Sequence, residues 1–155
     1  MNDLEKINDQ FEYYKENNRH IWYKKLNKWE MLLNDNSIDI LDKHFFLINK
    51  IETYYRFRNI DDFALDKAIE WCYQQIEIAA KSKIAFIKDY KNSKLPAHTG
   101  FKQLAIINEK QWNIEMAIKL CKQALNMWWW EWMTAWRENR EKRIAKLENK
   151  LKKNN

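Results

Sequence analysis

The sequence predicts an all-α fold of about seven helices, stacked as antiparallel hairpins within one domain of 155 residues. The chain contains one Gly and one Pro, whereas a sheet protein with many tight turns needs more of both. Residues that favour helices, such as Lys, Glu, Leu, Ile, Gln and Ala, are abundant. Apolar residues also recur at alternating intervals of three and four, which is the spacing of an amphipathic helix.

Two N-terminal helices are expected within residues 1–36. The first spans about 2–17, and its apolar face holds Leu4, Ile7, Phe11 and Tyr14. The second spans about 22–33, and its apolar face holds Trp22, Leu26, Trp29 and Leu33. The run Asn-Asp-Asn-Ser at 34–37 is rich in turn and capping residues, so it is expected to separate these helices from the next one.

The middle of the chain, residues 38–90, is expected to form a degenerate hairpin. Its first helix runs to about Tyr55, and its second starts after Asp62 and continues to about Tyr90, with no clear break inside it. Residues 91–100 form the clearest loop because they contain both Pro96 and Gly100. Residues 97–126 then form a second hairpin with a corner near Gln111–Asn113, and a basic capping helix occupies 128–153.

The two hairpins look like copies of one repeat. Ala68, Ile69 and Cys72 recur as an identical Ala-Ile-x-x-Cys frame that starts at Ala117, 49 residues later. Further apolar positions match at the same offset, and small residues at matched positions let two helices approach closely. A fixed offset of this kind indicates a stacked array of helical hairpins, because each hairpin alone cannot bury its apolar face. The alternative is chance similarity between two amphipathic helices.

The second copy resembles a tetratricopeptide repeat (TPR). The matching positions are Phe101, Leu104, Ala105, Ala117, Cys121 and Ala124. Asn108 replaces the usual Tyr, and Trp129 replaces the usual terminating Pro. The first copy matches at Tyr55, Ala68 and Cys72, but Arg56 replaces the Gly. The stretch is also similar to that of small bacterial and phage-type TPR-like repeat proteins, so a TPR-like fold is expected in the C-terminal two thirds.

This resemblance implies a module that holds a peptide or a partner protein in a concave groove and carries no catalytic chemistry. Transferred position by position, it assigns the groove lining to the first helix of each hairpin. The residues so implied are Lys50, Thr53 and Phe57 in the first copy and Lys102, Ile106, Glu109 and Lys110 in the second. The alternative is that these are ordinary solvated or core positions.

The sequence lacks the short motifs that are typical of enzymes. A single Gly cannot build either glycine-rich phosphate loop. His20, His44 and His98 lie in separate segments, and neither H-E-x-x-H nor C-x-x-C occurs, so no metal site or cofactor is expected. Cys72 and Cys121 fall on apolar faces, which indicates core positions in a reduced, cytoplasmic chain rather than nucleophiles. No segment suggests a signal peptide or a membrane span. The chain is therefore not expected to be an enzyme or to bind a membrane.

The Trp-rich run at 128–132 has two interpretations. Adjacent residues point in different directions around a helix, so Trp128 and Trp130 are placed at the edges of the apolar face. There they either fill gaps between helices or form an exposed aromatic anchor for a partner. An exposed anchor of this kind could equally support self-association.

The C-terminal helix holds most of the net charge of +6. Residues 137–155 contain eight basic and three acidic residues. This helix is either a solvated cap, a surface for an acidic protein, or a nucleic-acid contact. The last reading assigns the contact to Arg140, Lys142, Arg143, Lys146 and Lys150. The sequence thus predicts a protein–protein interaction module, a small adaptor or inhibitor, with nucleic-acid binding as the alternative.

Overall fold

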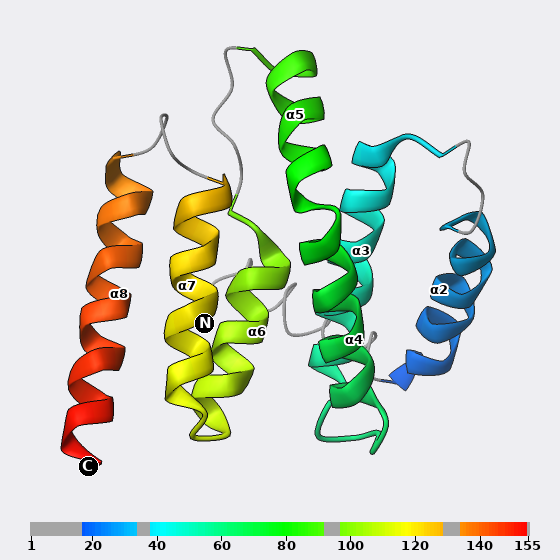
Figure 1. The fold of residues 1–155 in the computed structure, drawn as a ribbon. Coiled ribbons are helices and arrows are strands. Elements are labelled where there is room, and N and C mark those ends of the chain that lie inside the picture. Colours follow the sequence, from blue (N-terminus) through cyan, green and yellow to red (C-terminus); the bar gives the residue numbers. More distant parts are fainter. Residues whose placement is uncertain (1–16, 34–37, 92–96, 129–133, 155) are drawn as a thin grey trace, which may run out of the picture.

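The computed structural model describes residues 17–33, 38–91, 97–128 and 134–154, and it is all-α over these residues (Figure 1). Some side chains within these helices are not described, and they include those of Trp128 and Arg140. The predicted first helix falls within residues 1–16 and so lies outside the described residues. The seven described helices are α2 (Arg19–Leu33), α3 (Ile40–Arg56), α4 (Ala64–Glu77), α5 (Ala79–Asp89), α6 (Thr99–Lys110), α7 (Ile114–Trp128) and α8 (Thr134–Lys153).

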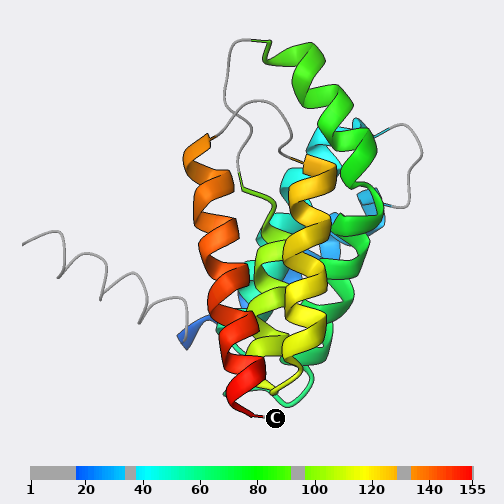
Figure 2. The same ribbon diagram turned by 60° about the vertical axis from the view of Figure 1, so that its left-hand side comes forward.

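Several helices that follow each other in the chain lie side by side, whereas α5 continues from the end of α4 (Figures 1 and 2). α3 packs against α4, α6 against α7, and α7 against α8. α4 and α3 also contact α6, and α5 contacts α3 and α7, so the two predicted hairpins share one core. α2 lies at the opposite end of the row from α8 and packs against α3.

Small residues allow this close packing. Ala68 and Cys72 of α4 are fully buried, and so are Ala117 and Cys121 at the matching positions of α7. The positions that match in the sequence therefore also match in burial. Both cysteines are free thiols. Burial raises the pKa of the Cys72 thiol to about 12, which makes it a poor nucleophile.

Gly100 belongs to the first turn of α6, not to the loop in which the sequence placed it. A Cβ at this position would lie 2.9 Å from the carbonyl oxygen of Cys72 and 2.9 Å from Oε1 of Gln75. The Gly100 N–H donates a hydrogen bond of 2.6 Å to that same Oε1. The single Gly of the chain is thus explained by the close approach of α6 to α4.

The long second helix expected up to Tyr90 is divided into two. Ile78, with φ −92° and ψ 4°, ends α4 and starts α5. The bend allows α5 to contact α3 and α7, whereas α4 contacts α3 and α6. The helix expected to begin at 128 also differs: α7 continues to Trp128, and α8 begins at Thr134.

Candidate functional site

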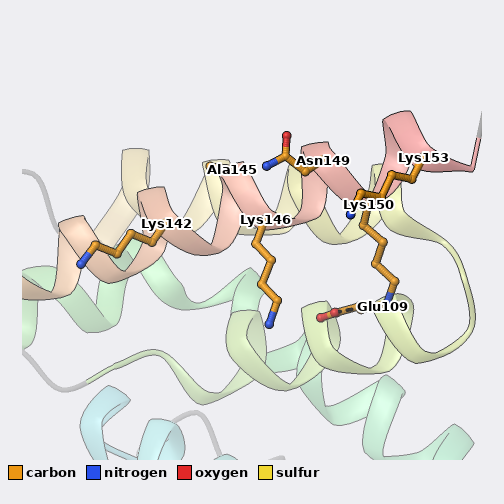
Figure 3. Close-up of a pocket in the computed structure, with 7 residues that line it drawn as sticks. All are labelled: Glu109, Lys142, Ala145, Lys146, Asn149, Lys150 and Lys153. Carbon is orange, nitrogen blue, oxygen red and sulfur yellow. Dashed lines mark ion pairs between the residues drawn. The ribbon is translucent and has the colours of Figure 1, made fainter.

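An open groove runs between α8 and the C-terminal end of α6 (Figure 3). We call it the α6–α8 groove, and its volume is about 700 Å³. Its lining residues are Glu109, Lys142, Ala145, Lys146, Asn149, Lys150 and Lys153. Four lysines from one helix and a single carboxylate from another therefore line the groove, which has an excess of positive charge.

The amphipathic character of α8 explains how the lysines reach this face. Ile144 and Leu147 are buried in the interface with α7, and Leu151 is partly buried there. Lys142, Lys146, Lys150 and Lys153 follow one another at intervals of four, four and three residues, so they share another face of the same helix. Figure 3 shows Lys146 and Lys150 pointing from α8 toward α6.

Glu109 is the charged centre of the groove. Arg143 donates a hydrogen bond of 2.9 Å from Nη2 to Oε2 of Glu109. Lys150 Nζ lies 3.5 Å from the other carboxylate oxygen. The side chain of Glu109 is 25% exposed, so this carboxylate is only partly screened by water. The shorter bond makes Arg143 the firmer partner and leaves Lys150 more weakly held.

Trp112 stands at the end of the groove in an unusual backbone conformation. It has φ 62° and follows the last turn of α6, where its N–H bonds to the Glu109 carbonyl and the Asn113 N–H bonds to the Asn108 carbonyl. Gly usually occupies this position of a helix terminus because other residues are strained there. The Trp112 side chain is 69% exposed, and Lys150 Nζ lies 4.8 Å from its ring centroid. An exposed indole with a positive φ thus lies beside Lys150, within the range of a cation–π interaction.

A second cluster joins α6 to α3. Lys110 Nζ donates a hydrogen bond of 3.2 Å to the Tyr55 hydroxyl. The guanidinium of Arg58 lies 4.0 Å from the centroid of the same Tyr55 ring. Lys102 and Lys110 are exposed on α6, and Ile106 is half-buried between them. The solvent-facing side of α6 therefore lies between this cluster and the α6–α8 groove.

Two residues that the sequence assigned to a groove are in the core. Lys50 is fully buried, and Phe57 is 1% exposed. Lys50 Nζ lies 3.3 Å from Glu30 Oε2 of α2 and 3.5 Å from the centroid of the Trp71 ring. The assignment of these two residues to an open surface is wrong, because α2 covers that face of α3. Thr53 is half-buried.

The environment of Lys50 explains how a buried ammonium is accommodated. Burial lowers the pKa of Lys50, and the nearby Glu30 carboxylate acts in the opposite direction. The face of the Trp71 ring adds a favourable interaction with the cation. Further polar contacts hold α2, since Asp61 accepts a 2.7 Å hydrogen bond from Tyr23 and lies 3.3 Å from Arg19.

Two sites that the sequence kept separate form one surface. Glu109 was assigned to a peptide groove, whereas Arg143 and Lys150 were assigned to nucleic-acid contact, and the three side chains meet across α6 and α8. Lys142 and Lys146 line the same groove. The side chains of Arg140 and Trp128, and the whole of Trp130, lie outside the described residues.

Sequence reasoning missed Trp112, Asn149 and Lys153 as lining or flanking residues of this groove. Lys153 was detectable, because it extends the lysine spacing on α8 by one further turn. Trp112 was not, because no sequence signal announces a Trp with positive φ.

Two histidines from separate segments of the sequence meet in the core. His44 and His98 were placed in separate segments, yet both are fully buried, and their ring centroids lie 5.6 Å apart. His98 Nδ1 accepts a hydrogen bond from the Phe101 N–H and so caps α6, and the Phe86 ring lies 5.4 Å from His44. The pair joins the two hairpins. Over the described ranges, no three His, Cys, Asp or Glu residues are grouped as metal ligands would be.

Comparison of the chain with protein-family models, with curated proteins and with solved structures finds no match. Within the part of the chain that the structure describes, no helix is long and apolar enough to cross a bilayer.

Proposed function

We propose that this protein is a small protein-binding module, an adaptor or inhibitor, that holds its partner in the α6–α8 groove and on the adjoining face of α6. One observation carries the proposal. Lys142, Lys146 and Lys153 line an open groove, and no carboxylate of the described residues lies within ion-pair distance of them. Cations that no carboxylate of the described residues pairs with are available to an external anion.

The arrangement of hairpins supports a TPR-like classification as part of this proposal. α6 and α8 border the groove, and α3 lies beside α6, so helices from successive hairpins would line one side of the stack. A repeat array typically uses such a side for binding. The two buried free thiols agree with a cytoplasmic location. The buried positions of Cys72 and His44 support binding rather than catalysis.

Nucleic-acid binding is the second candidate. It is favoured by the exposed indole of Trp112, which lies beside Lys150 of the groove. Single-stranded nucleic acid is commonly held by aromatic stacking together with a basic groove. The Glu109 carboxylate in the groove opposes this candidate, because a uniformly charged backbone would have to pass it.

Site-specific photo-crosslinking tests the proposal. A photoreactive amino acid would replace Ile106 or Asn149 in turn, and matched controls would replace Tyr73 or Ile84, which are exposed on α4 and α5. In nuclease-treated lysate of the native host, the first two probes should give the same protein adduct and the controls should not. Adducts from the control probes alone would contradict the proposal. Adducts that disappear with nuclease would favour the second candidate.

A further inference from the structure

The spacing of the lysines on α8 is close to the spacing of alternate residues in an extended peptide. An α-helix rises about 1.5 Å per residue, so Lys142, Lys146 and Lys150 follow one another at intervals of about 6 Å. In an extended peptide, alternate side chains point to the same side and are separated by about 6.6 Å. A chain lying parallel to α8 would therefore bring every second residue opposite one lysine.

We infer that the α6–α8 groove binds an extended peptide segment with acidic residues at alternate positions, which pair with Lys142, Lys146 and Lys150. This inference rests on the proposed function and adds the chemistry and conformation of the partner. The charge of the groove favours an anionic ligand, since four lysines and the single carboxylate of Glu109 line it. The intervening residues of the peptide face away and need no charge.

Glu109 marks one carboxylate position within the groove. Its interaction with Lys150 at 3.5 Å shows that a carboxylate reaches this lysine from the α6 side. Arg143 holds Glu109 more closely, at 2.9 Å, so Lys150 can exchange Glu109 for a peptide carboxylate without leaving Glu109 unpaired. Lys150 also lies 4.8 Å from the centroid of the Trp112 ring, so the ring face adds a favourable interaction with its ammonium.

Glu109 also favours a peptide over a nucleic acid. A peptide can place an uncharged residue opposite this carboxylate, whereas each unit of a nucleic-acid backbone is negative. The volume of about 700 Å³ suits a single extended chain rather than a duplex. Phosphates of an extended single strand have a comparable spacing, so an oligonucleotide is the necessary competitor in the test.

The test is a titration of the full-length protein with dye-labelled peptides, followed by fluorescence anisotropy at low salt. One ten-residue peptide carries Glu at alternate positions with Ser between them, and a second has the same composition with all Glu residues in one block. A thymidine oligonucleotide of equal net charge is the third probe. We expect the alternating peptide to bind most tightly and to weaken as salt is raised.

Two charge-matched triple variants locate the binding. K142Q/K146Q/K150Q should weaken the alternating peptide about tenfold. K81Q/K88Q/K119Q removes three exposed lysines of α5 and α7 and should leave the affinity unchanged. Circular dichroism spectra of both variants check that each is folded. Similar losses in both variants would overturn the inference, because binding would then depend on net charge alone.

Three further results of the titration would count against an acidic peptide in the groove. Equal affinity for the block peptide, tighter binding of the oligonucleotide, or no peptide binding at all would each overturn the inference. If the crosslinking probes at Ile106 and Asn149 still captured a protein, the proposed function would stand without this partner chemistry. If the peptide bound but those probes captured no protein, the proposed function would fail instead.

Discussion

Arg143 of α8 donates a 2.9 Å hydrogen bond to Glu109 of α6 across 34 residues of sequence. The two helices are connected through α7, and α8 itself packs against α7. The interaction therefore fixes the distance between the lysine row and the end of α6. It also neutralises the carboxylate that would otherwise reduce the attraction of the groove for an anionic partner.

The backbone strain at Trp112 predicts a difference between two substitutions. Trp112→Gly and Trp112→Ala both remove the indole, but only Gly adopts a positive φ without steric cost. The free energy of unfolding should be higher for the Gly variant by about 1 kcal/mol, after allowance for the greater chain entropy of unfolded Gly. Urea denaturation of both variants measures this difference in the free energy of unfolding. An Ala variant as stable as the Gly variant would show that the turn is not strained.

The close approach at Gly100 predicts a large effect from one methyl group. In Gly100→Ala, the new Cβ would lie 2.9 Å from the Cys72 carbonyl oxygen, which belongs to a rigid helix backbone. The free energy of unfolding should fall by about 2 kcal/mol as α6 moves away from α4. Thr99→Ala, in the same helical turn, is the matched control and should change stability less. Thermal unfolding of both variants measures the difference. A Thr99→Ala variant less stable than Gly100→Ala would contradict the close approach of α6 to α4.

The ion pair between Lys50 and Glu30 predicts unequal losses of stability when its two partners are replaced. Glu30→Gln leaves the buried Lys50 ammonium without its carboxylate and should lower the free energy of unfolding by about 2 kcal/mol. Lys50→Met keeps most of the volume and leaves Glu30, which is 41% exposed, to water. The Met variant should therefore be near wild type in stability. Chemical denaturation measures the stability of both variants. A Lys50→Met variant less stable than Glu30→Gln would contradict this prediction.

Burial of His44 predicts that the protein loses stability in mild acid. Burial lowers the pKa of His44 from 6.5 to about 4, so the native state binds fewer protons than the unfolded chain between these values. The associated stability is fully present above pH 6.5 and is lost as pH falls toward 4, by up to about 3 kcal/mol. His44→Phe should flatten this dependence in urea titrations at several pH values.

The control for His44 is His20→Phe, because His20 is exposed on α2. It should retain the wild-type dependence of the unfolding free energy on pH.

The groups around His44 include His98, Phe45, Phe86 and Gln75, and the Gln75 amide donates a 3.2 Å hydrogen bond to the His44 carbonyl. An unchanged slope in His44→Phe would assign the acid sensitivity to another group.

The helical class and much of the core were predictable from the sequence. Ala68, Cys72, Ala117 and Cys121 lie on stripes of helical period, and that period directly reports which side of a helix is buried. The bend at Ile78 was not predictable, because neither Gly nor Pro marks it. It depends on the packing of α5 against α3 and α7, which local sequence does not encode.

The candidate site was predictable only in its parts. The lysine spacing on α8 follows from helix geometry, so Lys142, Lys146 and Lys150 could be grouped from the sequence. Their meeting with Glu109 could not, because it depends on how α8 packs on α7. Lys50 was misassigned for a similar reason: its burial depends on α2, a helix from outside the repeat.

The most direct test of the central claim is a charge exchange across the α6–α8 groove. The variant K142E/K146E should lose the alternating Glu peptide and gain affinity for the same peptide with Lys at every Glu position. The wild-type protein should show the opposite preference, and both affinities are measured by fluorescence anisotropy. A variant that still prefers the Glu peptide, or that binds neither peptide, would contradict the claim that an acidic segment lies along this lysine row.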